Sequence, residues 1–138
     1  MKAYRIGLVA AEFNFDVTSM MIQRAKAEAE FLGVKITREV FVPGVYDIPL
    51  AVKKLVEMDD IDAVITIGAV IKGETDHDQV IMAQAARKIT DLSLEYNKPV
   101  ALGITGPGET QLQAMDRIEK GRDAVDAVVK MLQRFEKL

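Results

Sequence analysis

The sequence predicts an α/β fold, a three-layer αβα sandwich with a four-stranded parallel sheet, on two observations. An unbroken apolar run from Ala63 to Ile67 is typical of a central parallel strand, which is buried on both faces. Strand patterns also alternate with helix patterns along the whole chain, and parallel strands need such helical crossovers between them. We therefore expect helices on both faces of the sheet.

Before the central strand, the pattern predicts two strands and two helices. Tyr4 to Ala10 is a short apolar strand, and apolar residues recur at helical spacing from Asp16 to Leu32. Val34 to Val40 alternates apolar and polar residues, as expected of an edge strand with one solvated face. A loop from Val42 to Pro49 then leads into a helix from Pro49 to Met58, because proline suits the first turn of a helix.

The central strand, predicted over Ala63 to Ile67, is expected to end in Gly68 and Gly73, where a glycine-bearing turn leads to His77 and a helix that reaches Tyr96. The remaining segments are a strand, a turn and two helices: Val100 to Thr105, Gly106 to Gly108, Glu109 to Glu119, and Gly121 to the end. No linker, repeat or low-complexity segment interrupts this order, so we expect one domain over residues 1–138.

The composition narrows the classes of function. Hydrophobic residues make up 49% of the chain, enough for a buried core, and the net charge of -3 disfavours a nucleic-acid partner, which needs a basic face. With no cysteine and one histidine, we expect no disulfide and no metal site built from these residues. No apolar run approaches the ~20 residues of a membrane span, and the N-terminus lacks a signal-peptide pattern. We expect a cytoplasmic protein without a membrane partner.

Three turns are expected to meet at the carboxyl edge of the sheet, where ligands bind in open α/β folds. They are Glu12 to Asn14, Gly44 to Asp47, and Lys72 to His77, and a fourth segment, Leu102 to Thr105, ends nearby. Together they would bring two aromatic residues, an acid, a glycine turn and the single histidine to one crevice. The glycine turn precedes a helix N-terminus, which presents unpaired N–H groups to an anion.

Each candidate also has an ordinary structural explanation. Phe13 could belong to the core, Asp47 could cap the following helix, and His77 could be a polar residue of a first helical turn. The glycine turn alone is a weak phosphate signal, well below that of a P-loop. Arg117 and Lys120 could be solvated surface charges.

Four stretches together resemble the 6,7-dimethyl-8-ribityllumazine synthase family, most closely its short archaeal type. They are Ala11 to Asn14, Val42 to Pro49, Gly68 to His77, and Ala114 to Gly121. The third stretch is highly specific when the second is in register with it, and the resemblance covers nearly the whole chain. It implies the flavodoxin-like lumazine synthase fold.

The resemblance implies a transferase of riboflavin biosynthesis that acts on two small molecules. These are 5-amino-6-(D-ribitylamino)uracil and 3,4-dihydroxy-2-butanone 4-phosphate, which condense through an imine with release of phosphate and water. No metal, nucleotide or redox cofactor is implied. The absence of cysteine agrees with this chemistry.

The resemblance also assigns roles to particular residues. Those assigned to the heterocycle and its ribityl chain are Phe13, Asn14, Val45, Tyr46, Asp47, Val70 and Ile71. Those assigned to the phosphate are Gly73, Glu74, Thr75, Arg117 and Lys120. His77 would be the catalytic residue that relays protons. Two positions depart from many members: Glu74 replaces a small residue, and Leu102 replaces an aromatic residue that reaches a neighbouring site.

The family assembles as pentamers, often as twelve pentamers in a hollow shell, with sites shared between subunits, so the resemblance implies a homo-oligomer. Two related alternatives stay open, an archaeal-type riboflavin synthase and a non-catalytic shell protein that binds flavin or lumazine. The pair of His77 and Arg117 favours an enzyme over a pure binder. A receiver-type signalling domain is disfavoured, because Phe13 and Asn14 stand where its acidic cluster would be.

Overall fold

The computed structural model describes residues 3–73 and 76–138, in which strands and helices alternate. In chain order the elements are β1 (Arg5–Ala11), α1 (Phe15–Leu32), β2 (Lys35–Val42), the 3-10 turn η1 (Val45–Asp47), α2 (Ile48–Val56), β3 (Ala63–Ile71), α3 (Asp78–Tyr96), β4 (Val100–Glu109), α4 (Gln111–Asp116) and α5 (Lys120–Phe135). The α/β class expected from the sequence is confirmed.

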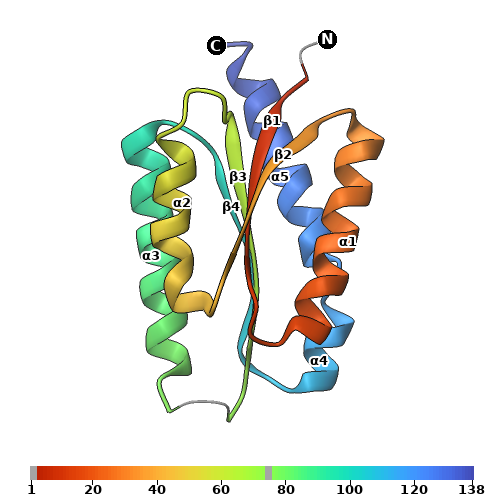
Figure 1. Ribbon diagram of the computed structural model, residues 1–138, viewed down its shortest axis with the longest axis vertical. Coiled ribbons are helices and arrows are strands. Elements are labelled where there is room, and N and C mark those ends of the chain that lie inside the picture. Colours follow the sequence, from red (N-terminus) through yellow and green to blue (C-terminus); the bar gives the residue numbers. More distant parts are fainter. Residues whose placement is uncertain (1–2, 74–75) are drawn as a thin grey trace.

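The four strands form one parallel sheet in the order β2-β1-β3-β4. β3 lies between β1 and β4 and is buried along its whole length, as its unbroken apolar sequence predicts. β2 lies at an edge, as its alternating sequence predicts. Helices α1 and α5 cover one face and α2 and α3 the other, which confirms the αβα sandwich (Figure 1).

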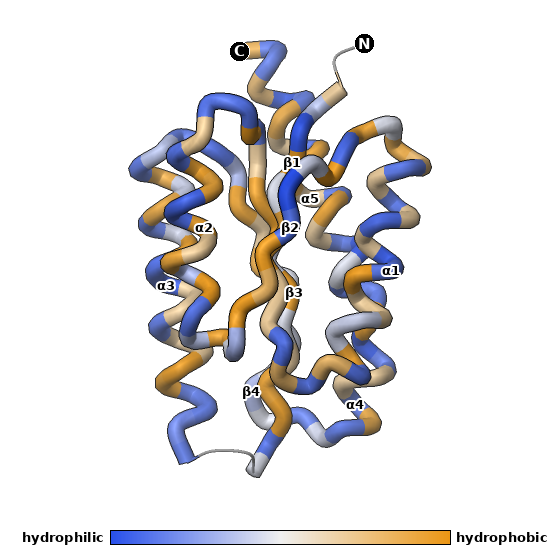
Figure 2. Tube along the Cα trace, in the orientation of Figure 1, coloured by the Kyte–Doolittle hydropathy of each residue, from blue (hydrophilic) through white to orange (hydrophobic). Residues whose placement is uncertain are grey.

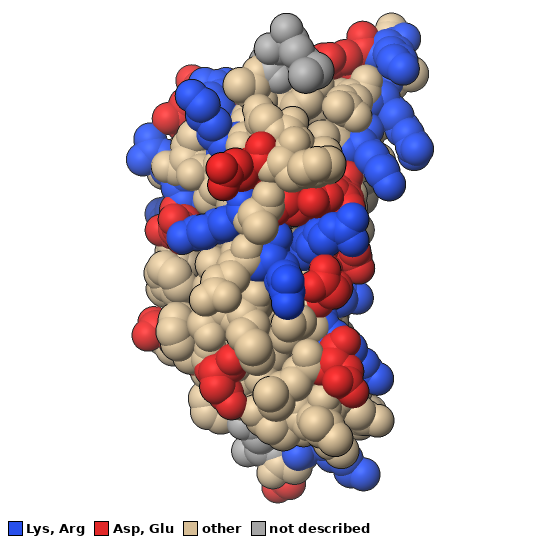
Figure 3. Space-filling view, turned by 90° about the vertical axis from the view of Figure 1, so that its right-hand side faces the viewer, with Lys and Arg blue, Asp and Glu red and all other residues tan. Residues whose placement is uncertain are grey.

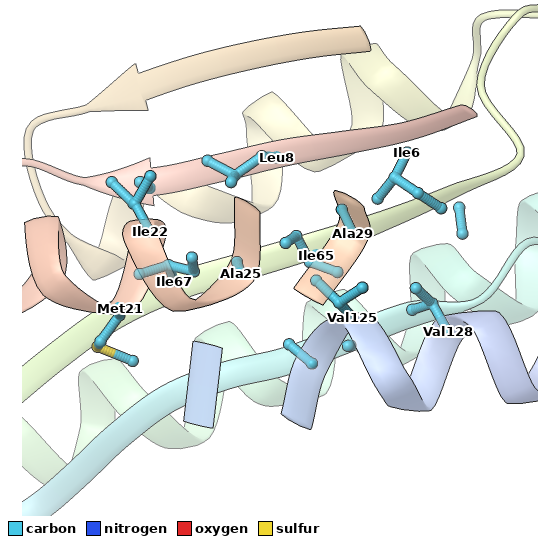
Figure 4. Close-up of a cluster of buried hydrophobic side chains, with 14 of the residues drawn as sticks. Ile6, Leu8, Met21, Ile22, Ala25, Ala29, Ile65, Ile67, Val125 and Val128 are labelled. Carbon is cyan, nitrogen blue, oxygen red and sulfur yellow. The ribbon is translucent and has the colours of Figure 1, made fainter. Parts of the chain in front are cut away.

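Each face of the sheet has its own hydrophobic core. On one face, side chains of β1 and β3 such as Leu8 and Ile65 pack against Ala25 of α1 and Val125 of α5 (Figure 4). The second core lies between the sheet and the pair α2 and α3. Figure 2 shows hydrophobic residues concentrated along the central strands, whereas the helices alternate between hydrophobic and hydrophilic residues. The two cores fix the sheet rigidly, and its carboxyl edge carries the turns.

β3 and β4 are both longer than the sequence predicts. The strand predicted over Ala63 to Ile67 is too short, because pairing with β4 continues and β3 reaches Ile71. The prediction of a turn at Gly106 to Gly108 is also wrong, because this segment belongs to β4, which pairs again at Glu109 after a register shift. Positive φ angles at the two glycines serve a bulge in the strand rather than a turn.

The helix expected from Glu109 begins two residues later, as α4, because Thr110 caps it. The Thr110 hydroxyl accepts the Gln113 N–H at 3.1 Å, and the Gln113 side-chain oxygen accepts the Thr110 N–H at 2.9 Å. This reciprocal capping box fixes the helix start. Glu109 consequently stays at the end of β4, where it is buried.

The loop expected from Val42 to Pro49 contains the short turn η1, which the sequence pattern did not predict. The following helix α2 begins at Ile48, with Pro49 in its first turn as expected. The other element boundaries differ from the predicted ones by a few residues. Such differences are ordinary at frayed helix and strand ends.

Candidate functional site

The turn after β1 is held at the carboxyl edge by bonds to the end of β2. The Glu12 N–H donates to the Val42 carbonyl at 2.7 Å, and the Phe13 N–H donates to the Pro43 carbonyl at 3.1 Å. Asn14 turns the chain into α1 with a φ of 64°, a conformation that asparagine tolerates better than most residues. The turn therefore presents the Phe13 ring, which is 58% exposed, at the edge of the sheet.

A second turn, formed by η1 and the residue before it, approaches β3 closely. The Asp47 carboxylate accepts the Gly44 N–H at 3.0 Å, which closes the turn ahead of α2. A β-carbon at Gly68 would lie 2.9 Å from Val45 Cγ2, closer than real contacts allow. The absence of a side chain at Gly68 therefore lets η1 pack onto the end of β3.

These two turns and the end of β3 enclose an apolar cavity of about 140 Å³. Its lining includes four residues that the sequence assigns to the heterocycle: Phe13, Val45, Tyr46 and Val70. Among the described residues, its lining also includes Gly44, Ala69, Asp78 and Ile81. Apolar cavities with aromatic rings in their walls bind planar ligands by burying apolar area and stacking on the rings.

Three other residues assigned to the heterocycle do not line this cavity. The Asn14 side-chain nitrogen donates to the Ala69 carbonyl at 2.9 Å, which ties the first turn to β3. The Asp47 carboxylate accepts from the backbone of its own turn. Ile71 belongs to the core on the other side of the sheet from Val70, because successive side chains of a strand alternate between faces.

The glycine turn after β3 leads into α3. Gly73 has a φ of 88°, which glycine adopts without a steric penalty. Glu74 and Thr75, both assigned to the phosphate, lie outside the described residues. His77 is exposed at the N-cap of α3, and its carbonyl accepts the Ile81 N–H at 2.9 Å. The imidazole is therefore carried by the first turn of a long helix.

A second cavity, of about 510 Å³, lies between the start of α3 and the bulged part of β4. The described residues that line it are Lys72, Asp76, Asp78, Gln79, Val80, Pro107 and Gly108. Asp78 lines this cavity and the apolar one, and its Oδ1 is buried without a hydrogen-bond partner among residues 3–73 and 76–138. A buried carboxylate oxygen without a partner is costly, so this atom is suited to accept a hydrogen bond from a ligand.

Arg117 and Lys120 form a separate cationic group beyond the end of β4. They line a third cavity, of about 480 Å³, with Ile104, Thr105, Gly106, Asp116, Glu119 and Asp123. The Arg117 Nη1 donates to Glu109 Oε1 at 3.1 Å. Within residues 3–73 and 76–138, this cavity has no lining residue in common with the apolar cavity. One chain therefore presents the aromatic group and the cationic group at two separate places.

Leu102 lies apart from the three cavities described above. It is 36% exposed on β4, where it pairs with Thr66 of β3. Because β4 is an edge strand, a side chain at this position is open to contact by another molecule.

Asp78, Ile81 and Glu109 are among the residues that the structure places at these sites and that the sequence did not assign to them. Ile81 follows His77 by four residues, a spacing that puts both on one side of a helix, so helical periodicity could have found it. Asp78 gave no distinct signal, because other acidic residues stand close to it in the sequence. Glu109 was expected in a helix, and nothing in its sequence context signals a buried acid.

Two kinds of feature are absent from residues 3–73 and 76–138. No group of histidine, aspartate and glutamate side chains in these ranges could hold a metal ion. No helix in them is long and apolar enough to cross a membrane.

The chain matches a family model described as 6,7-dimethyl-8-ribityllumazine synthase over residues 3–136. It is 62% identical over 128 residues to the 6,7-dimethyl-8-ribityllumazine synthase of Picrophilus torridus, which covers 93% of this chain and 94% of that relative. It is 59% identical over 136 residues to that of Methanothermobacter thermautotrophicus, with 99% and 98% covered. It is 57% identical to that of Methanobrevibacter smithii over the full length of both chains. The chain therefore belongs to the 6,7-dimethyl-8-ribityllumazine synthase family.

Proposed function

We propose that this chain condenses 5-amino-6-(D-ribitylamino)uracil with 3,4-dihydroxy-2-butanone 4-phosphate to give 6,7-dimethyl-8-ribityllumazine, a step of riboflavin biosynthesis. The observation that carries the proposal is the apolar cavity with Phe13 and Tyr46 in its lining, at the sheet edge where His77 begins α3. Such a cavity suits a planar, uncharged heterocycle. We propose that the chain acts as one domain and in the cytoplasm.

The reaction requires two substrates to be held together while protons move. The 5-amino nitrogen attacks the ketone carbon, and loss of water gives an imine. Phosphate then leaves, and the ribityl-bearing nitrogen closes the second ring with loss of another water. Holding two reactants in a productive orientation supplies a large part of the acceleration. His77 accepts a proton in one step and returns it in another.

The aromatic group binds the heterocycle. Phe13 stacks on the pyrimidine, and Val45 and Val70 form apolar walls, as their place in the cavity lining supports. The unpartnered Oδ1 of Asp78 accepts an N–H or O–H of the substrate. Tyr46, which is 72% exposed, covers the outer edge of the ring or the ribityl chain.

The remaining residues assigned to the heterocycle act on its surroundings. Asn14 and Asp47 hold the two turns through their hydrogen bonds, and Ile71 anchors β3 in the opposite core. Their substitution would displace the cavity walls rather than remove a direct contact.

The phosphate binds between the glycine turn and a guanidinium group. Gly73 lies in the turn that leads to α3, and the unpaired N–H groups of a helix N-terminus favour an anion. A guanidinium forms paired hydrogen bonds with phosphate oxygens. Because the Arg117 cavity and the aromatic cavity of one chain have no described lining residue in common, we propose that Arg117 and Lys120 come from a neighbouring subunit. The assembly would be a pentamer or twelve pentamers.

The surface supports such self-association. The face formed by α1, α4 and α5 carries charges of both signs in its upper half and a wide area with few charges in its lower half, toward the carboxyl edge (Figure 3). Phe15 of α1 and Leu112 of α4 are 51% and 70% exposed. Large apolar side chains at the surface favour contact with another chain.

The direct test is to incubate the purified chain with both substrates and to measure fluorescent lumazine and released phosphate. We expect both products in equal amounts, and neither when one substrate is omitted. Tight binding of lumazine or riboflavin without turnover would instead favour the non-catalytic shell protein. Conversion of lumazine into riboflavin would favour the riboflavin synthase.

A further inference from the structure

Glu109 is a buried acid that the proposed reaction leaves without a role. It ends β4, only 1% of the residue is exposed, and its side chain is fully buried. Taking a carboxylate out of water is strongly unfavourable unless partners compensate for it. The partners of this carboxylate therefore indicate what it does.

Each oxygen of the Glu109 carboxylate has a different partner. Oε2 accepts the hydroxyl of Thr105 at 2.6 Å, and Thr105 is itself only 3% exposed. Oε1 accepts Nη1 of Arg117 at 3.1 Å. The Glu109 carbonyl also accepts the Lys72 N–H at 2.7 Å, next to the glycine turn. One residue thus connects Arg117 to the turn that begins the proposed phosphate site.

The contact with Arg117 uses only part of the guanidinium. The Arg117 side chain is 50% exposed and lines the same cavity as Lys120, so part of it is accessible to a ligand. An arginine that is already held in place loses less conformational freedom when it binds an anion. The buried carboxylate of Glu109 therefore orients the exposed side chain of Arg117.

We propose that Glu109, held by Thr105, is a positioning residue that orients Arg117 for the phosphate of the sugar-phosphate substrate. The proposal rests on the function proposed above, in which Arg117 binds this group. It applies equally whether Arg117 serves its own chain or a neighbouring one, because all three residues belong to one chain.

Simple electrostatics makes the opposite prediction, which gives the proposal a sharp test. A carboxylate close to an anion site repels the anion, so its removal would strengthen phosphate binding if orientation did not matter. If orientation dominates, removal of the carboxylate weakens binding. The sign of the change in phosphate affinity therefore distinguishes repulsion by the carboxylate from orientation of Arg117.

The experiment measures binding of inorganic phosphate to the purified full-length chain by calorimetry. We expect Glu109→Ala and Thr105→Val to weaken binding about tenfold each, and Thr105→Ser, which keeps the hydroxyl, to bind as the unmodified chain does. In an Arg117→Ala background, Glu109→Ala should have no further effect. Glu95→Ala is the matched control, because it removes an exposed acid of α3 that does not line this cavity, and it should leave phosphate binding unchanged.

Steady-state kinetics give a second readout that a general loss of structure would not produce. The KM for the sugar phosphate should rise in the Thr105→Val chain, whereas the KM for the aminouracil should stay unchanged. Circular dichroism would show whether Glu109→Ala folds. If it does not fold, the comparison of Thr105→Val with Thr105→Ser tests the proposal.

Unchanged or tighter phosphate binding in the folded Glu109→Ala or Thr105→Val chain would overturn the proposal, as would the absence of phosphate binding to the unmodified chain. The proposed function fails separately, if the unmodified chain makes no lumazine from its two substrates. Weakened phosphate binding in the variants would then still support the role of Glu109.

Discussion

His77 is the N-cap of α3, and the next turn of this helix contributes Asp78 and Ile81 to the lining of the apolar cavity. Proton transfer by one side chain contributes about 10²–10⁴-fold to a rate, whereas orientation of two substrates contributes more. We therefore expect His77→Ala to lower the single-turnover rate by no more than that range while lumazine formation stays measurable. A His77→Ala chain with no detectable product would contradict the view that orientation dominates.

Arg117 should be more important than His77, because the phosphate must be held by a compensating charge. Arg117→Ala also leaves the buried Glu109 carboxylate without its cationic partner, and a buried charge that loses its partner is destabilising. We expect Arg117→Ala to reduce kcat/KM further than His77→Ala does. Arg134→Ala removes an exposed arginine from the last turn of α5 and serves as the control. Equal losses of kcat/KM in the Arg117→Ala and Arg134→Ala chains would refute a specific role of Arg117.

At the scale of elements, Gly68 sets the distance between η1 and β3. Gly68→Ala adds a β-carbon 2.9 Å from Val45 Cγ2, and overpacking of this kind costs about 1–3 kcal/mol. We expect η1 to shift, so that the KM for the aminouracil rises. The double variant Gly68→Ala/Val45→Ala makes room for the new methyl group and should recover part of the loss. A single variant with unchanged KM would show that η1 does not shape the binding cavity.

The contact between α1 and α5 contains an acid pair that makes stability depend on pH. A hydrogen bond with Asp126 and burial raise the pKa of Glu28 above its ordinary value of 4.5, although Arg122 partly opposes the shift. The folded chain thus holds this proton more tightly than the unfolded chain does. The resulting stabilisation is full below pH 4.5 and is lost as the pH rises through the raised pKa.

Glu28→Gln removes this titration and tests the sign. The free energy of unfolding of the unmodified chain, minus that of the variant, should fall as the pH rises from below 4.5 toward neutrality. Denaturant titrations at several pH values measure it. Glu95→Gln, at an exposed position of α3, should show no such trend. A difference that rises with pH would contradict the proton-sharing contact.

The elements show what a sequence pattern can and cannot predict. The burial of β3 and the edge position of β2 were predictable, because each follows from apolar residues within one segment. The extension of β4 through Gly106 to Glu109 was not, because it depends on pairing with β3 across the bulge. The capping box at Thr110 and Gln113 is a local signal that predicts the start of α4. Helical periodicity alone did not predict this start.

At the scale of the whole molecule, the sequence predicts which residues belong to the site better than it predicts whether those residues lie close together. Phe13, Tyr46 and Val70 could be found because each lies at or after the carboxyl end of a strand. Whether Arg117 reaches them depends on side-chain reach and on assembly, which the order of elements does not encode. The structure of one chain keeps the two groups in different cavities.

The central claim is that one lumazine-forming site combines the aromatic cavity of one chain with Arg117 of another. The most direct test mixes two inactive variants, Phe13→Asp and Arg117→Ala, by co-expression. Random assembly then gives about one quarter of the shared sites two unmodified halves, and lumazine formation should recover to about that fraction of the unmodified activity. Lack of recovery in mixed oligomers whose composition is confirmed by mass spectrometry would contradict the claim, because each chain would then need both groups itself.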